Sequence, residues 1–155
     1  METVTIEVAV HAKSWDYKEA MGIDYKVKGD SAKGFFADLE VEIDKEMFEL
    51  YKDTNFCDTP MCHFDVEMKN GEFNVWLDDE TNEMRDKEYE LVACSKSYEE
   101  CAKEMRATTI GFMESELEGF LEYYREKVEY AEEGEDIEHE RELLARLEDY
   151  FKKVA

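Results

Sequence analysis

The chain has 155 residues, 43% of them hydrophobic and 13% aromatic, and its 42 Asp and Glu against 19 Lys and Arg give a net charge of −23. A chain of this length suits one folded domain, and so many aromatic residues are not typical of disordered acidic tails. The charge excludes the simplest kind of nucleic-acid-binding protein, which needs Lys and Arg to neutralise phosphates, and it disfavours binding to anionic membranes. Cationic partners are favoured instead.

No apolar run approaches the roughly 18 residues that a membrane span needs, and the N-terminus does not begin a positively charged signal segment. We therefore expect a cytoplasmic protein, in the cytoplasm of a host cell if a phage encodes it. In that compartment disulfides are rare, so reduced thiols are expected at Cys57, Cys62, Cys94 and Cys101.

Two strands and a short helix are predicted in the N-terminal part. Strict alternation of apolar and polar residues predicts a strand over residues 3–12. Ser14 can cap a helix over residues 15–21, and Gly22 is suited to end it. A second strand is predicted over residues 23–28.

Residues 35–53 fit two patterns. Their apolar residues alternate as in a strand, but a different subset recurs at helical spacing, so a single helix is the alternative. The β-branched residues Val41 and Ile43 favour a strand as far as Ile43, followed by a helix over residues 45–52. The acids on the polar side of this strand are then Asp38, Glu40, Glu42 and Asp44.

A β-hairpin over residues 62–79 is the clearest local prediction. Asn70-Gly71 lies between two alternating runs, and this dipeptide readily adopts the positive φ angles of a type I′ turn. Because strand side chains alternate between faces, one face is apolar: Phe64, Val66, Met68, Phe73, Val75 and Leu77. The opposite face is mostly carboxylate: Asp65, Glu67, Lys69, Glu72, Asn74, Trp76 and Asp78.

An acidic connection over residues 79–86 leads to the last predicted strand, residues 88–94. In this strand we expect Tyr89, Leu91 and Ala93 to face the core. The acids that face outward are then Glu88 and Glu90.

Helical spacing replaces alternation after residue 96. Ser97 and Glu100 form a capping box, which starts a long helix that runs to near Gly134. The stretch 108–111 is a place where this helix can bend or break. A last helix over residues 136–154 returns antiparallel to the first.

These elements predict an α+β protein with a single domain over residues 1–155. Residues 1–96 are expected to form mainly an antiparallel β-sheet of about five to six strands around the central hairpin 62–79. Residues 97–155 are expected to form an antiparallel helical hairpin packed on one face of the sheet. The alternative is a helical pair that projects into solvent and dimerises.

Metal and catalytic motifs are weak. Cys57, Cys62 and His63 form a local group, with His11 and Cys94 as distant additions, but a zinc site normally shows closely spaced ligand pairs, repeated twice. The acids from Asp78 onward lack the glycine and glutamate of a calcium loop. No phosphate loop, dinucleotide fingerprint or nucleophile motif is present. We therefore predict no metal, no cofactor and no enzymatic activity.

Acidic residues recur in rows. Glutamates of the long helix follow one another mostly at four-residue spacing, which is mildly destabilising for like charges, and further acids follow at the helix C-terminus, the unfavourable end of its dipole. Local stability does not explain this pattern. Such rows can be ordinary solvated faces, or they can form ion pairs with the lysines and arginines of a nucleic-acid-binding channel.

In size and charge the chain resembles the small acidic nucleic-acid mimics that phages and mobile elements use against restriction or RNA-guided nucleases. This resemblance implies an inhibitor that binds the basic groove of a nucleic-acid-handling enzyme, without binding nucleic acid or a membrane itself. Trp76 is a possible aromatic anchor. The predicted partner-binding residues are Asp38, Glu40, Glu42, Asp65, Glu67, Glu72, Trp76, Asp78, Glu88, Glu90, Glu114, Glu118, Glu122, Glu126 and Glu129.

The alternative function is an acidic adaptor or assembly protein that acts through its C-terminal helices. In that case a homodimer is expected to form through an apolar stripe on the last helix, consisting of Leu143, Leu147, Tyr150 and Val154.

Overall fold

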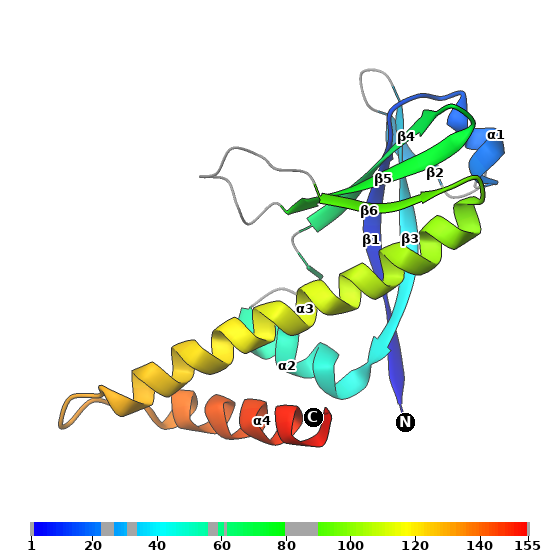
Figure 1. Ribbon diagram of the computed structural model, residues 1–155. Helices are drawn as coiled ribbons and strands as arrows, with labels where there is room; N and C mark the ends of the chain where they lie inside the picture. The colour runs from blue at the N-terminus through cyan, green and yellow to red at the C-terminus, as the bar shows by residue number, and fades with distance from the viewer. Residues whose placement is uncertain are drawn as a thin grey trace. The chain divides into compact units, whose positions relative to one another are not determined.

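A computed structural model describes residues 2–22, 27–30, 34–55, 59–60, 62–79 and 90–154 (Figure 1). Within these ranges the order of elements is β1 (Thr3–Ala12), α1 (Tyr17–Met21), β2 (Val27–Asp30), β3 (Phe35–Asp44), α2 (Lys45–Asn55), β4 (Cys62–Lys69), β5 (Glu72–Asp79), β6 (Glu90–Ser95), α3 (Tyr98–Glu129) and α4 (Glu138–Val154). The chain divides into two compact units. Unit 1 is Met1–Val4, Ile43–Asp58 and Ile110–Ala155, and unit 2 is Thr5–Glu42 and Thr59–Thr109.

The strands form one sheet in the order β2-β3-β1-β4-β5-β6, most of which lies in unit 2. The pairs β2–β3, β4–β5 and β5–β6 are antiparallel, whereas β1 and β4 are parallel, with Val10 opposite Phe64. The predicted α+β class and mostly antiparallel sheet are confirmed. The parallel pair was not predicted, and the crossover of some 50 residues between β1 and β4 is long enough to allow it.

One face of the sheet is apolar and is covered in unit 2 by the first part of α3. Tyr98 packs edge-to-face on Phe73 of β5, with ring centroids 5.8 Å apart, and Arg106 Nε donates to the Glu40 carbonyl at 3.0 Å. Cys101 and Met105 of α3 are buried. Most of the apolar side chains that alternation places on this face are buried, among them Ile6, Val8, Val10, Leu39, Val41, Phe64, Val66, Phe73 and Val75.

The hairpin forms as predicted, with β4 and β5 paired from Cys62–Asp79 to Lys69–Glu72. Asn70 and Gly71 in the turn have φ angles of 55° and 79°, the conformation that Asn-Gly favours.

Strand β6 differs from its prediction. The register shifts between the pairs Val75–Ala93 and Trp76–Leu91, so that β6 carries an extra residue, Val92. A bulge of this kind reverses the alternation of side chains on one side of it. Leu91, expected to face the core, is therefore 48% exposed, whereas Ala93 is buried as predicted.

Residues 35–55 form β3 followed directly by α2, as predicted, and the single-helix alternative is wrong. Helix α1 begins two residues later than predicted, and Gly22 ends it at φ 67°. Strand β2 begins at Val27, and the first residues predicted for it, 23–26, lie outside the described residues. The same is true of 80–89, which include most of the predicted acidic connection and Glu88.

The long helix begins at the predicted cap, where the Glu100 amide donates to Ser97 Oγ at 3.4 Å. It continues without interruption through residues 108–111 and ends at Glu129, earlier than predicted. At the point where α3 passes from unit 2 to unit 1, Thr109 Oγ1 donates to the Met105 carbonyl at 2.8 Å. No helix in the described ranges is long and apolar enough to cross a membrane.

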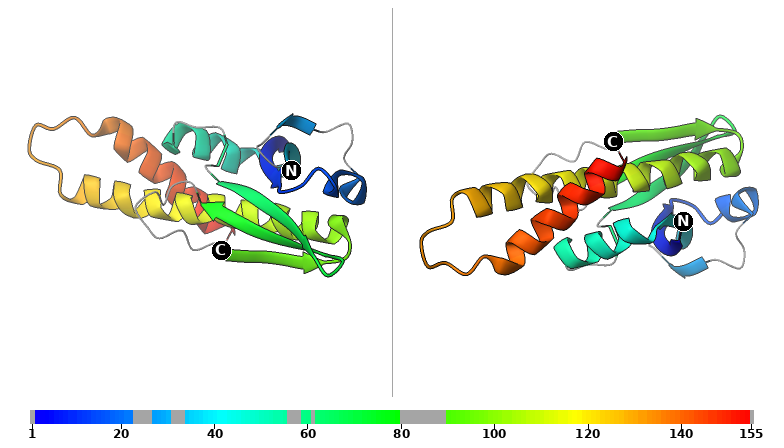
Figure 2. Two further views of the ribbon diagram at one scale, coloured as in Figure 1. Left: turned by 90° about the horizontal axis from the view of Figure 1, so that it is seen from above. Right: turned by 90° about the horizontal axis from the view of Figure 1, so that it is seen from below.

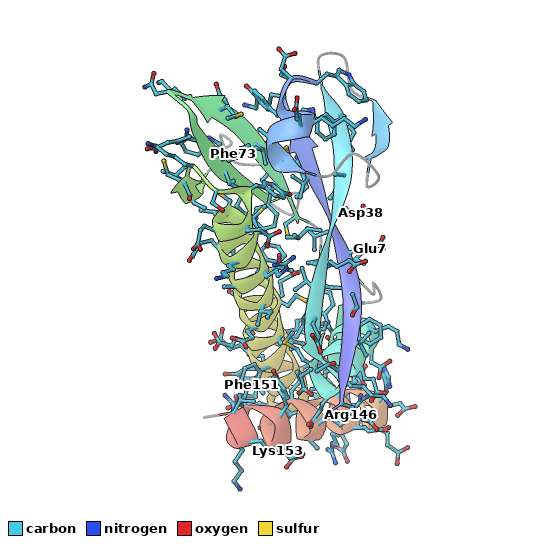
Figure 3. The ribbon with its side chains drawn as sticks, turned by 90° about the vertical axis from the view of Figure 1, so that its right-hand side faces the viewer. Glu7, Asp38, Phe73, Arg146, Phe151 and Lys153 are labelled. Carbon is cyan, nitrogen blue, oxygen red and sulfur yellow. The ribbon has the colours of Figure 1, made fainter. Side chains whose placement is uncertain are left out.

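In unit 1, α2, the later part of α3 and α4 pack around a helical core that includes Met47, Leu50, Tyr51, Met113, Leu117, Leu121, Ile137, Leu143 and Leu147. Figure 2 shows α4 returning across this part of α3 with α2 beside it. Polar contacts at the edges join the helices. Arg146 pairs with Asp53 of α2 at 2.9 Å, Lys153 with Glu46 of α2 at 3.3 Å, and Arg125 with Glu148 at 3.4 Å. Figure 3 labels Arg146 and Lys153 on α4.

Candidate functional site

The acids predicted to face outward from β3 do so. Glu40 and Glu42 are exposed, and Asp38 is half-buried. They lie on the outer face because the residues that alternate with them along β3 are buried in the core. Glu7 of the neighbouring strand β1 is also exposed, and Figure 3 labels it with Asp38. This part of the sheet therefore presents carboxylates to solvent.

The outer face of the hairpin differs from its prediction. Asp65 and Asp78, expected to be solvated, are only 7% and 8% exposed. Glu67 is exposed, and its Oε2 lies 3.8 Å from Nζ of Lys13, the residue that follows β1. The Glu72 carboxylate accepts a hydrogen bond from Cys94 Sγ at 3.0 Å. The outer face is not a uniform carboxylate surface, because neighbouring strands supply partners that the hairpin sequence does not contain.

The two buried aspartates belong to a cluster with His11 and His63, which we call the histidine–aspartate cluster. In the parallel pair β1–β4, His11 lies opposite Asp65, and in the antiparallel pair β4–β5, His63 lies opposite Asp78. Asp65 Oδ1 is 3.0 Å from His11 Nδ1 and 3.6 Å from His63 Nε2. Asp78 Oδ2 is 3.4 Å from His63 Nε2. Three strands therefore bring four titratable side chains together.

Aromatic side chains border the cluster. The His11 ring stacks on Phe36 of β3 with centroids 4.7 Å apart, and Trp76, opposite Asp65 in the β4–β5 register, is half-buried. Together with Lys13 and Glu67, Trp76 and the cluster line a pocket of about 520 Å³ in unit 2. Trp76 is thus part of the wall of a pocket rather than a protruding anchor.

Burial alone would raise the pKa of the Asp65 carboxyl. The hydrogen bonds from His63 and His11 outweigh burial and hold this pKa below its ordinary value. Asp65 is therefore a carboxylate near neutral pH, although it is largely removed from water.

The structure separates two of the metal ligands considered from the sequence, Cys62 and His63, and brings a different group of ligands together. Cys62 faces the core and His63 the outer face, because they are consecutive strand residues, and Cys57 lies outside the described residues. Instead, His63, Asp65 and Asp78 each offer one ligand atom, and these atoms lie within 4.8 Å of one another. Among the described residues, this is the group whose side chains are placed to hold a metal ion.

A cysteine nucleophile is disfavoured at the two thiols whose environment is clearest. The hydrogen bond to Glu72 raises the pKa of Cys94, and burial raises the pKa of Cys101. A thiolate is the reactive form of cysteine, so both thiols are less reactive than an ordinary one near neutral pH.

The acidic residues of the long helix that were predicted to bind a partner are all exposed, and all lie in the part of α3 that belongs to unit 1. This row, which we call the α3 acidic row, consists of Glu114, Glu118, Glu122, Glu126 and Glu129. Glu90 begins β6, and Glu88 lies outside the described residues.

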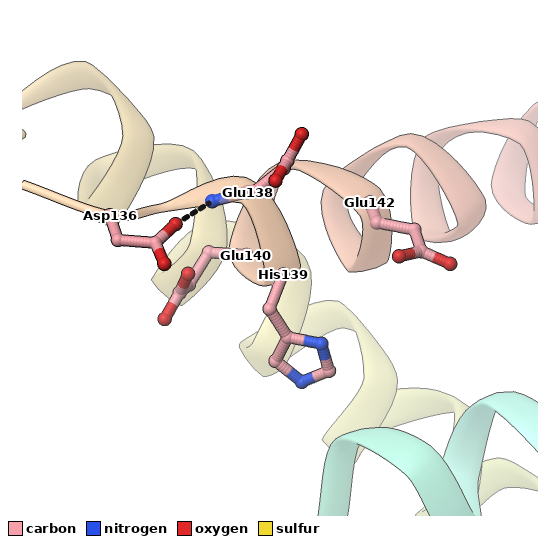
Figure 4. A pocket seen from close by; sticks show the side chains of 5 residues that line it. All are labelled: Asp136, Glu138, His139, Glu140 and Glu142. Carbon is pink, nitrogen blue, oxygen red and sulfur yellow. Dashed lines mark hydrogen bonds between the residues drawn. The ribbon is translucent and has the colours of Figure 1, made fainter.

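A second acidic concavity, of about 600 Å³, lies at the start of α4 and is lined by Asp136, Glu138, His139, Glu140 and Glu142 (Figure 4). The Glu138 amide donates to Asp136 Oδ1 at 3.3 Å, which caps the helix. The other side chains spread apart in Figure 4, and most are exposed.

The apolar stripe proposed for dimerisation is not available on the surface. Leu143, Leu147 and Tyr150 are buried within the chain, because α4 packs on the other helices of unit 1, and only Val154 of this stripe is exposed. A homodimer through this stripe is therefore not supported.

The sequence contained a signal for the histidine–aspartate cluster. His63 precedes Asp65 by two residues, and His11 lies on the polar side of its strand, so alternation places all three on outer faces. What local patterns could not reveal is that β1 lies next to β4.

No protein-family model, curated protein or solved structure matches this chain. Two features of the described residues bear on function: the α3 acidic row and the histidine–aspartate cluster.

Proposed function

We propose that this protein is a non-catalytic inhibitor that binds the basic groove of a nucleic-acid-handling enzyme, such as a nuclease complex, in place of nucleic acid. The observation that carries the proposal is the α3 acidic row, whose five glutamates are all exposed on one helix. The partner is a basic protein, and the inhibitor itself binds neither nucleic acid nor a membrane.

The spacing of the row suits such a groove. Four residues of α-helix rise about 6 Å, so the carboxylates from Glu114 to Glu126 extend over about 18 Å of axis. One strand of a duplex carries a phosphate every 3.4 Å or so, which makes the row about half as densely charged. The acids that follow α3 add to it: Glu132, Glu133 and Glu135, all exposed.

Charge is concentrated in the unit that carries the row. Unit 1 has 21 acidic and eight basic residues, whereas the longer unit 2 has 21 acidic and 11 basic residues. A field of this sign accelerates encounter with a positive groove and weakens as salt is added.

The charges at the end of α3 also favour a role of this helix in binding a partner. Its last turn has Lys127 as its basic residue and is followed by acids, although cations are favoured at a helix C-terminus. Helix α4 has the favourable arrangement, with Lys152 and Lys153 in its last turn. The acids of α3 thus reduce local stability, which is consistent with selection for binding.

Two exposed tyrosines lie beside the row. Tyr123 and Tyr130 are 53% and 75% exposed and line a shallow concavity with Glu126, Lys127 and Glu135. Exposed aromatic residues are frequent hot spots of protein interfaces. In our proposal these two tyrosines replace Trp76 as the aromatic anchors.

The experiment compares the wild type with the triple variant Glu118→Gln, Glu122→Gln, Glu126→Gln. Immobilised wild-type protein is expected to retain a nucleic-acid-handling enzyme from a host lysate at low salt and to release it when duplex DNA is added. With the purified partner, the variant should bind about 10-fold more weakly, because steering and ion pairs are both reduced. Surface plasmon resonance over a salt series measures this effect.

The matched control is Asp16→Asn, Glu19→Gln, Glu104→Gln, which removes the same charge from exposed positions in unit 2. It should bind nearly as tightly as the wild type. If both variants weaken binding equally, net charge rather than the row determines affinity. If duplex DNA fails to displace the retained protein, the proposed mode of inhibition is wrong.

A further inference from the structure

We propose that His63, Asp65 and Asp78 bind one divalent transition-metal ion, with Zn²⁺ as the best match, on the outer face of the β4–β5 hairpin. This site lies in unit 2, whereas the α3 acidic row lies in unit 1, so the proposal stands independently of the proposed function.

The first argument is the distances between ligand atoms. His63 Nε2 lies 3.4 Å from Asp78 Oδ2 and 3.6 Å from Asp65 Oδ1. Four ligands at Zn–N and Zn–O distances of 2.0–2.1 Å in a tetrahedron lie about 3.3–3.4 Å from one another, whereas neighbouring ligands of an octahedron lie about 2.9 Å apart. The separations of His63 Nε2 from the two carboxylate oxygens match tetrahedral edges to within a few tenths of an ångström. The third pair, Asp65 and Asp78, lies within 4.8 Å.

The second argument is the burial of charge. Asp65 and Asp78 are both more than nine-tenths buried and both face the imidazole of His63. Two carboxylates removed from water need compensating positive charge. A divalent ion on a neutral His63 would supply it in full. Protonation of His63, together with that of His11 beside Asp65, is the competing explanation, and the response of the His63 signals to Zn²⁺ distinguishes it from a bound metal ion.

The third argument is the surroundings of the ligands. Ligating carboxylates are usually hydrogen-bonded by a further residue, which orients them. His11 Nδ1 lies 3.0 Å from Asp65 Oδ1 and is itself held by its stack on Phe36. We therefore assign His11 as a positioning residue. The fourth metal position would face the pocket that Trp76 and Lys13 border, where water can complete the tetrahedron.

Nonspecific binding must be removed from the measurement, since a chain with a net charge of −23 attracts any cation. Exposed carboxylates prefer hard ions such as Mg²⁺, whereas a site with an imidazole ligand prefers Zn²⁺. The protein is therefore stripped with a chelator, dialysed, and titrated with ZnCl₂ at physiological salt in excess Mg²⁺, against a chromophoric Zn²⁺ indicator.

The wild type is expected to bind one equivalent of Zn²⁺ under these conditions. His63→Ala and Asp78→Asn should each weaken binding by about 100-fold or more, because each removes a ligand. His11→Ala should weaken it by about 10- to 100-fold, as is typical when a residue that orients a ligand is lost. The matched control is His139→Ala, which removes a histidine from the exposed acidic concavity of α4 and should leave affinity unchanged.

A second measurement needs no variant. On titration of the wild type with Co²⁺, intense visible absorption indicates tetrahedral coordination, and Zn²⁺ should shift the imidazole NMR signals of His63 but not those of His139. Far-UV circular dichroism of each variant shows whether its fold is intact. The proposal is overturned if the wild type binds no Zn²⁺ in excess Mg²⁺, if His139→Ala weakens binding as much as His63→Ala, or if the His63 signals are insensitive to Zn²⁺. The last result would identify His63 as a counter-ion only.

Discussion

Replacing Gly34 with alanine is expected to destabilise the protein by about 3 kcal/mol or more, at the upper end of the range for overpacked sites. A Cβ at this buried position would lie 1.8 Å from the Ala12 carbonyl oxygen and under 3 Å from two further backbone atoms of Ala12 and Lys13. These backbone atoms cannot move aside to relieve the overlap, as the end of a flexible side chain could. The end of β1 is also fixed on its other side, where the Lys13 amide donates to the Val66 carbonyl at 3.1 Å.

Urea denaturation followed by circular dichroism measures this effect. The matched control is Gly111→Ala, an exposed helical position where the added Cβ meets no atom within 4 Å. It should stabilise the protein by about 0.5–1 kcal/mol, because alanine is the better helix former. A Gly34→Ala variant as stable as the wild type would show that β1 and β3 are not packed as described. A displaced β1 should also weaken Zn²⁺ binding, since His11 lies on this strand.

Replacing Leu147 with alanine is expected to lower the free energy of unfolding by about 2–5 kcal/mol. This side chain is fully buried between Leu143 and Tyr150 on the inner side of α4, so its removal leaves a cavity in the helical core of unit 1. The loss should not depend on protein concentration, because the leucine is covered by its own chain. A dimer interface would instead give a midpoint that rises with concentration.

Val154→Ala is the control, since Val154 is an exposed residue at the end of the same helix and should change stability by less than about 0.5 kcal/mol. Chemical denaturation at two protein concentrations tenfold apart makes the comparison. If Leu147→Ala changes self-association and not the stability of the monomer, the packing of α4 described here is wrong.

Local patterns in the sequence predicted those elements whose structure depends on neighbouring residues. Asn70-Gly71 determines the hairpin turn, and Ser97 with Glu100 determines where α3 begins. Alternation likewise distinguished β3 from a helix. These predictions held because turns, caps and periodicity act over a few residues.

Features that depend on distant segments could not be predicted in this way. Alternation predicts that Asp65 faces solvent, because nothing near it in the sequence indicates that His11 becomes its neighbour through the β1–β4 pair. Alternation likewise predicts that Leu91 faces the core, because the sequence of β6 alone does not indicate the bulge that forms where it pairs with β5. The stripe containing Leu147 had the right periodicity, but periodicity does not reveal whether the covering surface belongs to the same chain.

The parallel β1–β4 pair has a consequence for the order in which the histidine–aspartate cluster assembles. His63, Asp65 and Asp78 all belong to one hairpin, and hairpins form within about 1–10 μs. Joining His11 to Asp65 closes a loop of 54 residues, at an entropic cost whose length-dependent part is about 3.5 kcal/mol. We therefore expect the three ligand atoms of His63, Asp65 and Asp78 to come together early in folding and His11 to join them late. Stopped-flow kinetics of a His11 variant would then show a faster unfolding rate and an unchanged overall folding rate.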